Sequence, residues 1–577
     1  MKFASMMPRL LTRRWAAALV PLLAAACGAP NHQAAAPPPA APQSALGSYL
    51  AASHAQIEHD YGNAARFLDH ALDADTGNYD LIRRTLLLRI SEGRVADAVP
   101  LAQRLVDIDG HTGIAALVLL EQDIKAQRYD AAVKNAAAMP RDGALRFSVP
   151  LLQAWAEAGR GGAAPALRAL DAMGGANGLQ PLRDLHAALV YDYADQVSDA
   201  AAAYDKLVAG AQPPTWRVAE LAGNFYERHG RAADARRLYE RGGGTLGLAD
   251  VASIGIARID QGIVPPRVIA SPADGAAEGL FDLAGLLNQR DTADAALIYA
   301  RLALDLAPNF AIDQLLIGEI RDAEGRPVDA LAIYRSIDRQ SPFSWMARLR
   351  AALELDALDR TDEAIASLKA MAAERQKRPD AVIELGDILR ARKRFPEAAS
   401  AYDTAIALTP NPQPSDWRLF YSRGVALERS GQWPRAEADL RRALELQPEQ
   451  PLVLNYLGYS WIDKGENLKD ALGMIQRAVA LRPNDGYIVD SLGWAYFRLG
   501  DFPQATAFLE RAIELLPEDP TINDHLGDAY WRTGRLAEAR YQWRRALQFQ
   551  PEADEVKGIQ AKLDHGLGAL AETVSGG

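Results

Sequence analysis

The sequence contains a single cysteine among its 577 residues. One thiol excludes disulfide bonds within the chain, zinc sites of the CxxC type and cysteine-ligated clusters, because each of these needs at least two cysteines. Positive charge is also in deficit, since 63 Lys and Arg residues face 74 Asp and Glu residues for a net charge of -11. A protein that binds the phosphate backbone needs an excess of basic residues, so nucleic acid is disfavoured as the main partner.

The common motifs of catalysis are missing as well. The chain has no GxxxxGKS/T, HExxH or GxSxG segment, and its nine histidines are scattered. None of these histidines pairs with acids at metal-ligand spacing on one helix face. We therefore expect a protein that is not an enzyme and that holds no metal, cofactor or small-molecule substrate.

Long apolar runs are absent apart from one short stretch near the N-terminus. Residues 1–14 carry Lys2, Arg9 and two further arginines but no acid, and residues 15–26 are apolar. Twelve residues rise about 18 Å as a helix, well short of the roughly 30 Å hydrocarbon core of a bilayer. The layout is typical of a secretory signal peptide, which we place at residues 1–26.

The lone cysteine follows directly after this apolar stretch. The segment Leu23-Ala24-Ala25-Ala26-Cys27 resembles a bacterial lipobox, although its leucine stands four residues before the cysteine rather than three. The resemblance implies acylation of Cys27 and, because Gly28 is not an aspartate, an outer-membrane lipoprotein that faces the periplasm. The alternative is an unmodified cysteine in an ordinary signal peptide, and export by the twin-arginine route through Arg13-Arg14 also stays open. Residues 27–46, rich in Ala and Pro and uncharged, are interpreted as a tether.

The rest of the chain is dominated by an internal repeat. Residues 490–500 read DSLGWAYFRLG, and residues 524–534, 34 positions later, read DHLGDAYWRTG. An alanine recurs at similar intervals along the chain, at Ala64, Ala98, Ala132, Ala164, Ala200, Ala235, Ala296, Ala330, Ala364, Ala398, Ala436, Ala471, Ala505 and Ala539. These residues resemble the tetratricopeptide repeat (TPR), a 34-residue helix–turn–helix unit. The resemblance implies an all-α solenoid, a right-handed superhelix of about fourteen repeats with a concave groove.

The regularity of the repeat changes along the chain. Residues 47–245 match it in a degenerate form, and residues 279–551 match it strongly. Between them, 61 residues separate Ala235 from Ala296, so we predict a distorted repeat and loop at 246–278 that forms a boundary. Residues 552–577 are predicted to form a capping helix and a tail, because a solenoid must cover its last apolar face.

Several side chains are predicted to line the groove. In the TPR family, positions 2, 5, 9, 12 and 13 of the first helix face it, and their chemistry here combines aromatic rings, arginines and acids. The predicted protein-binding residues are Tyr459, Asp463, Tyr487, Asp490, Trp494, Phe497, Arg498, Asp524, Asp528, Trp531 and Arg532. Aromatic and Arg side chains dominate protein-binding hot spots. For Trp494 and Trp531 a second interpretation stays open, namely that they fill the gap between neighbouring repeats, as we expect of Trp461, Tyr496 and Tyr530. We also expect these two tyrosines to lie beside the repeat glycines.

The order of lipoprotein signal, tether, degenerate repeats and regular repeats resembles the large TPR lipoproteins that act as adaptors for carboxy-terminal processing proteases in the bacterial envelope. This resemblance implies a scaffold that brings substrates such as peptidoglycan hydrolases to a periplasmic protease, with membrane contact through the lipid anchor only. The alternative is a TPR scaffold for outer-membrane protein assembly or for secretion of polysaccharide or protein. A third class is an enzyme with a catalytic insertion in residues 243–278, whose acids are Asp250, Asp260, Asp274 and Glu278.

Overall fold

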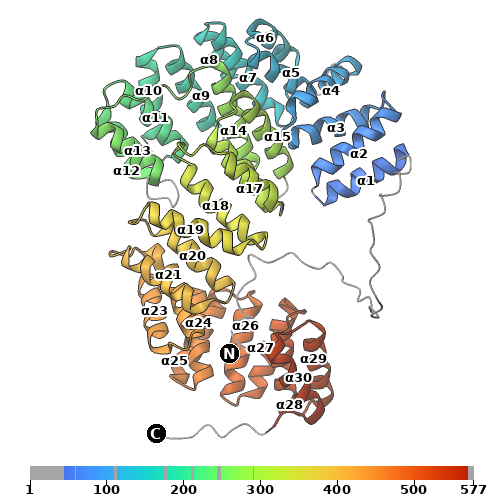
Figure 1. Ribbon diagram of the computed structural model, residues 1–577, viewed down its shortest axis with the longest axis vertical. Coiled ribbons are helices and arrows are strands. Elements are labelled where there is room, and N and C mark those ends of the chain that lie inside the picture. Colours follow the sequence, from blue (N-terminus) through green and yellow to red (C-terminus); the bar gives the residue numbers. More distant parts are fainter. Residues whose placement is uncertain are drawn as a thin grey trace, which may run out of the picture. The chain divides into compact units, whose positions relative to one another are not determined.

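The computed structural model describes residues 44–58, 60–109, 113–173, 179–209, 214–242, 249–289 and 292–568. The secondary structure of these residues is helical throughout, with no strand among them. The expected all-α fold is therefore confirmed (Figure 1). The chain divides into two compact units, and the division falls between Ala364 and Ile365. No described helix combines the length and the apolar composition that a bilayer span requires.

The helices of the N-terminal unit are α1 (Ala45–Ile57), α2 (Tyr61–Ala74), α3 (Tyr79–Ser91), α4 (Val95–Ile108), α5 (Gly113–Lys125), α6 (Tyr129–Ala138), α7 (Leu145–Gly159), α8 (Ala163–Asp171), α9 (Gln180–Tyr193), α10 (Val197–Val208), α11 (Trp216–Arg228), α12 (Ala232–Gly242), α13 (Ala249–Asp260), α14 (Pro272–Leu287), α15 (Ala293–Leu306), α16 (Ala311–Ala323), α17 (Pro327–Ser336) and α18 (Ser344–Ala357). Helix α19 (Thr361–Glu374) contains the division. The C-terminal unit continues with α20 (Asp380–Ala391), α21 (Phe395–Ala407), a 3-10 turn (Pro414–Asp416), α22 (Trp417–Arg429), α23 (Trp433–Leu446), α24 (Pro451–Lys464), α25 (Leu468–Leu481), α26 (Gly486–Arg498), α27 (Phe502–Leu515), α28 (Pro520–Arg532), α29 (Leu536–Gln548) and α30 (Ala553–His565).

The helices end where the sequence supplies end-forming residues. Gly465, Gly500 and Gly534 follow α24, α26 and α28 with φ values of 73°, 85° and 81°, a left-handed conformation that is strained for other residues. At the opposite ends, the side chains of Asp485 and Asp519 accept hydrogen bonds from backbone N–H groups in the first turns of α26 and α28. The spacing of 34 or 35 residues between successive signals therefore sets the lengths of the helices.

Within each helix pair, a glycine of the first helix lets the second helix approach closely. A Cβ atom added at Gly493 would lie 2.6 Å from Cγ of Leu509, and one added at Gly527 would lie 2.5 Å from the Trp543 ring. Any larger residue at these positions would force the two helices apart. The recurrent glycine of the sequence is thus a packing requirement.

Two tyrosines near these glycines occupy a different place from the one that we expected. The Tyr496 ring stacks on Phe508 at a centroid distance of 5.6 Å, and the Tyr530 hydroxyl donates a hydrogen bond of 2.8 Å to Glu510. The residues against the glycines are instead Leu509 and Trp543, because they come from the facing helix of the same pair. The prediction that the tyrosines lie beside the glycines was wrong.

The helix pair α14–α15 departs from the order of the array, and we call it the central hairpin. Helix α14 packs on α5, α7 and α9, and α15 packs on α3, α4 and α5. Figure 1 shows the pair enclosed by the arc that α3 to α13 describe. The concave side of the N-terminal array is therefore filled by helices of the same chain.

Small residues allow α14 to enter this space. A Cβ atom added at Gly275 would lie 2.3 Å from the buried ring of Trp155, and one at Gly279 would lie 3.3 Å from the His186 ring. The indole N–H of Trp155 donates to Nδ1 of His186 at 3.1 Å. Because Nδ1 accepts, the Nε2 atom of a neutral ring carries the proton and donates to Asp282 at 3.2 Å.

Ion pairs and hydrogen bonds fix the central hairpin at both of its helices. The fully buried carboxylate of Glu278 on α14 accepts a hydrogen bond of 2.7 Å from Nε of Arg217 on α11. On α15, Asp294 accepts a hydrogen bond of 2.7 Å from the Tyr61 hydroxyl on α2. The first contact joins residues 61 positions apart in sequence, and the second joins residues 233 positions apart.

The predicted boundary at 246–278 lies inside the N-terminal unit in this structure. The described part of this stretch forms helix α13, a connection over 261–271 and the start of α14 at Pro272. The central hairpin that follows packs back on α3 to α9, so it belongs with the helices before it. For this reason the compact units divide at Ala364 and Ile365 rather than at the irregular stretch.

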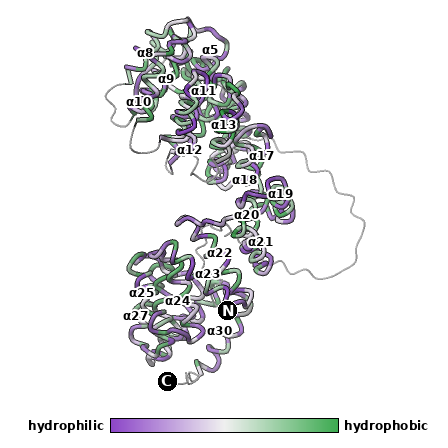
Figure 2. Tube along the Cα trace, turned by 90° about the vertical axis from the view of Figure 1, so that its left-hand side faces the viewer, coloured by the Kyte–Doolittle hydropathy of each residue, from purple (hydrophilic) through white to green (hydrophobic). Residues whose placement is uncertain are grey.

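The C-terminal unit is a simple succession of pairs. Among the residues that the structure describes, its main contacts join helices that are adjacent or next but one along the chain. Figure 2 shows hydrophilic and hydrophobic segments alternating along these helices, as expected when one face of each is buried. Helix α30 stands at the end of the succession, in the stretch where the sequence predicts a closing helix.

Candidate functional site

The eleven predicted protein-binding residues lie on three first helices, α24, α26 and α28, which contact one another in turn. We call this set the wall. It consists of Tyr459 and Asp463 on α24, Tyr487, Asp490, Trp494, Phe497 and Arg498 on α26, and Asp524, Asp528, Trp531 and Arg532 on α28. The repeat spacing of the sequence thus brings together side chains that are up to 73 residues apart.

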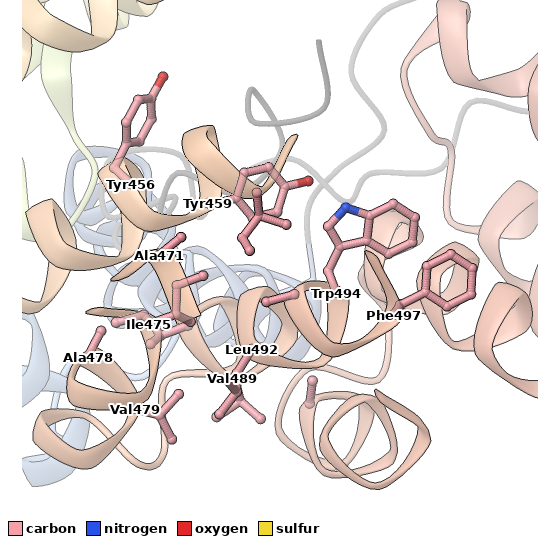
Figure 3. Close-up of a cluster of buried hydrophobic side chains, with 14 of the residues drawn as sticks. Tyr456, Tyr459, Ala471, Ile475, Ala478, Val479, Val489, Leu492, Trp494 and Phe497 are labelled. Carbon is pink, nitrogen blue, oxygen red and sulfur yellow. The ribbon is translucent and has the colours of Figure 1, made fainter. Parts of the chain in front are cut away.

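A stack of aromatic rings forms the middle of the wall. The Trp494 ring lies parallel to Phe497 at a centroid distance of 4.8 Å and to His525 at 4.0 Å. Figure 3 shows Tyr459, Trp494 and Phe497 following one another from α24 to α26. Because His525 belongs to the next repeat, Trp494 packs between repeats, which supports the second interpretation of this residue. Its role in binding stays a prediction.

His525, the buried ring on one side of this stack, is not among the residues that we predicted from the sequence. Its Nδ1 atom lies 3.0 Å from the Asp490 carboxylate, and both side chains are fully buried. A carboxylate only accepts, so Nδ1 carries the proton and Nε2 of a neutral ring is left as an acceptor. Nε2 has no hydrogen-bond partner among the described residues. The sequence does distinguish this position, because His525 occurs where the preceding repeat has Ser491.

The polar edge of the wall joins α24 to α26. Nη1 of Arg498 lies 3.1 Å from the Asp463 carboxylate, and both side chains are partly exposed. Behind this pair, burial raises the pKa of the Tyr459 hydroxyl, and the negative charges of Asp490 and Asp463 raise it further. Tyr459 is therefore a neutral phenol at any physiological pH.

The α28 part of the wall is engaged by the last helix. Nζ of Lys562 on α30 lies 2.7 Å from the Asp524 carboxylate and 2.8 Å from that of Asp528. Burial lowers the pKa of Lys562, but the two carboxylates outweigh it and the pKa is raised overall. The lysine remains charged and neutralises one of two neighbouring acids.

The other two α28 residues contact the segment after α30. The Trp531 ring lies against Gly566, and its centroid is 5.4 Å from that of Trp543. A guanidinium nitrogen of Arg532 donates a hydrogen bond to the carbonyl oxygen of Gly568. Trp531 thus packs within the end of the solenoid. Helix α30 also approaches the α24 part of the wall, because the negative charge of Glu555 contributes to the raised pKa of Tyr459.

Three of the four acids in the proposed catalytic insertion make structural contacts. No cluster of His, Cys, Asp and Glu suited to a metal ion occurs among them. Of the acids in the proposed insertion, Asp274 accepts from the backbone N–H of Ser271 at 2.8 Å in a helix cap, and Glu278 pairs with Arg217. Asp260 pairs with an arginine of α12. The side chain of Asp250, like Cys27, lies outside the described residues.

Comparison with known protein families identifies repeats in the C-terminal half. A family model described as tetratricopeptide repeat matches residues 349–411, 421–486 and 491–554. The TPR repeat-containing protein PA4667 of Pseudomonas aeruginosa is 29% identical over 193 residues, which cover 33% of this chain and 32% of that protein. The tetratricopeptide repeat-containing protein trd-1 of Caenorhabditis elegans is 30% identical over 207 residues, 35% of this chain and 24% of that protein. The chain thus spans a third or less of the length of these relatives.

Solved structures with similar helix arrangements include the anaphase-promoting complex hetero-tetramer Cut9-Hcn1, with 16% identity over 90% of this chain and 96% of that chain and a TM-score of 0.38. A tetratricopeptide repeat protein from Parabacteroides merdae is 15% identical over 44% of this chain and 97% of that chain, with a TM-score of 0.36.

Proposed function

Because the chain is a tetratricopeptide-repeat protein, we propose that it is a non-enzymatic scaffold that binds other proteins through the wall of its C-terminal unit. The observation that carries this proposal is the difference between the two concave sides. The central hairpin fills that of the N-terminal array, whereas α24, α26 and α28 of the C-terminal unit make most of their contacts with helices adjacent or next but one along the chain, and α30 approaches Tyr459 through Glu555. A partner would meet the α24–α26 part of the wall first.

The chemistry of this part suits a protein partner. Tyr487 and Arg498 on α26 are partly exposed, and the same helix carries Trp494 and Phe497 of the buried stack that includes His525. A rigid aromatic base loses little conformational entropy on binding, and an arginine at its edge can pair with an acid or stack on a ring. Binding energy would therefore concentrate on α26.

The finer part of the proposal concerns the place of the protein. The basic and apolar residues 1–26 and the cysteine after them support a lipoprotein of the bacterial outer membrane that faces the periplasm. There it would act as an adaptor that holds substrates such as peptidoglycan hydrolases near a carboxy-terminal processing protease. Holding both on one anchored scaffold raises the effective concentration of substrate at the protease, with no new catalytic group.

The test is a pull-down of the full chain, tagged at its C-terminus, from cross-linked envelopes, with identification of bound proteins by mass spectrometry. The variant Arg498→Ala should reduce recovery of the partner about tenfold, since a hot-spot arginine contributes roughly 1.4 kcal/mol or more. Arg442→Ala is the matched control, because Arg442 is a similarly exposed arginine on the second helix α23.

Three outcomes are informative. A protease recovered together with cell-wall hydrolases supports the adaptor, and assembly or secretion components without a protease support the alternative scaffold. Equal recovery with Arg498→Ala and Arg442→Ala would contradict binding through the wall.

A further inference from the structure

The first helix has an apolar stripe that no other described helix covers. Leu46, Leu50 and Ile57 are 68%, 59% and 73% exposed. At 100° per residue these positions fall within about 40° of one another around the helix axis. The buried residues Ala52 and Ala55 lie on the opposite face, against α2. Helix α1 therefore has one apolar face in the core and a second one that points outward.

This outward face differs from that of the last helix. Solenoids need polar outer faces on their terminal repeats, because nothing stacks on them. Helix α30 follows this rule in exposing Lys557, Gln560 and Asp564, whereas α1 exposes three large aliphatic side chains. Contiguous exposed apolar side chains mark a contact surface more often than a solvated one.

The electrostatics of α1 indicate what this surface contacts. Helix α1 contains no Asp, Glu, Lys or Arg. At its flank, the guanidinium of Arg84 on α3 lies 5.4 Å from the centroid of the Tyr49 ring, and Arg83 beside it is exposed. An uncharged apolar stripe with aromatic and basic residues at its edge is the arrangement that suits the boundary between lipid headgroups and acyl chains.

The length of chain before α1 places a bilayer within reach. Ser44 lies 17 positions after Cys27, and a chain of this length spans at most about 60 Å when fully extended. If Cys27 is acylated, as the proposed function holds, the stripe is confined near the membrane at high effective concentration, so a weak contact suffices.

We propose that the outer face of α1 rests on the lipid bilayer, with Leu46, Leu50 and Ile57 inserted among the headgroups and the adjoining acyl chains. The contact supplements the lipid anchor and fixes the orientation of the N-terminal end of the array at the membrane surface. The partner is the lipid bilayer rather than a second protein.

The single cysteine makes a direct test simple, because the chain from residue 28 onward contains none. A histidine tag at residue 28 attaches this chain to vesicles of phosphatidylethanolamine, phosphatidylglycerol and a nickel-chelating lipid, so the tether does not depend on acylation. An environment-sensitive fluorophore is placed at Leu50→Cys, or in the matched control at Asp73→Cys, an exposed position on α2. On vesicle attachment the signal at position 50 should rise at least about two-fold and shift to the blue, with no change at position 73.

The substitutions Leu46→Ser and Ile57→Ser in the labelled chain should abolish the rise while circular dichroism and attachment are retained. No rise on attached vesicles overturns the proposal, and so does a rise without vesicles that grows with protein concentration, which identifies a second copy as the occupant. Metabolic labelling of the wild-type chain with an alkyne fatty acid tests acylation of Cys27 separately, so failure of the anchor and failure of the α1 contact are distinguishable.

Discussion

The helix pairs of the two units are stabilised by different kinds of contact. In the C-terminal unit each pair is stabilised by its neighbours, whereas in the N-terminal unit many helices also pack on the central hairpin. Because every pair of the C-terminal unit makes equivalent contacts, the same residues recur at equivalent positions. In the N-terminal unit each helix makes different contacts with the central hairpin, so the residues at equivalent positions differ and the repeat pattern degenerates. Sequence regularity therefore reports how a solenoid is stabilised.

Particular contacts show this difference. In the C-terminal unit Gly493 and Gly527, one repeat apart, meet the same position of the second helix. In the N-terminal unit Trp155 meets Gly275, while Arg217 on another helix meets Glu278. A repeating sequence pattern cannot specify contacts that each occur only once in the chain.

The sharpest test removes the buried charge of the central hairpin. Glu278→Gln leaves the Arg217 guanidinium, which is nearly buried, without the carboxylate that it contacts on α14. Breaking one partner of a buried ion pair should lower the local opening free energy of α11 and α14 by about 3 kcal/mol. Hydrogen exchange with mass spectrometry measures it, and peptides of α26 serve as the internal control. Equal loss of protection in α26 would contradict the division into two units.

A second test compares two glycines in helices. Gly275→Ala places a Cβ atom 2.3 Å from the Trp155 ring, whereas Gly473→Ala on α25 meets nothing within 4 Å. The first change should destabilise the N-terminal unit by about 2 kcal/mol through overpacking. The second should stabilise α25 by up to about 1 kcal/mol, because alanine is the better helix former. Thermal unfolding measures the change in melting temperature of each variant. Changes of the same sign in both variants would contradict the expected difference between the two glycine positions.

The sequence predicted the regular half of the fold better than the other half. The helices of the C-terminal unit follow from the 34-residue spacing alone, but the return of α14 and α15 into the N-terminal array does not. Ala296 on α15 lies 34 residues before Ala330, so the sequence of the hairpin resembles the first repeat of the regular series. What distinguishes α14 is small residues on several faces, among them Gly275, Ala276 and Gly279. Such a helix can be buried all round.

For the candidate site, the sequence predicted which helices carry the residues but not the individual contacts between their side chains. Repeat positions place the wall residues on the first helices of three successive repeats, since the positions are a property of the repeat, and the role of these residues in binding stays a prediction. They do not reveal that Asp490 pairs with His525 or that Lys562 lies between Asp524 and Asp528. These partners come from helices that follow in the chain, His525 from α28 and Lys562 from α30, and no pattern within one repeat specifies a side chain that occurs in only one interface.

A last test concerns the pH dependence of stability, which should differ between the two units. Glu354 on α18 is almost fully buried, and burial, followed by the negative charge of Asp322, raises its pKa from 4.5 to about 7 against the opposing charge of Arg350. The folded state therefore holds this proton more tightly than the unfolded state. The stability that it contributes is fully present below about pH 4.5 and is lost as the pH rises through about 7.

Glu354→Gln removes the ionisation and keeps the shape of the side chain. At pH 8 the variant should exceed the wild type in stability of the N-terminal unit by up to about 3 kcal/mol, and at pH 4.5 the two should be equal within error. Urea unfolding monitored by hydrogen exchange of α18 gives both values, with α26 as the region that should not respond. A gain of the same size at both pH values would show that the carboxyl group is not titrating, because only a change in charge makes the difference depend on pH.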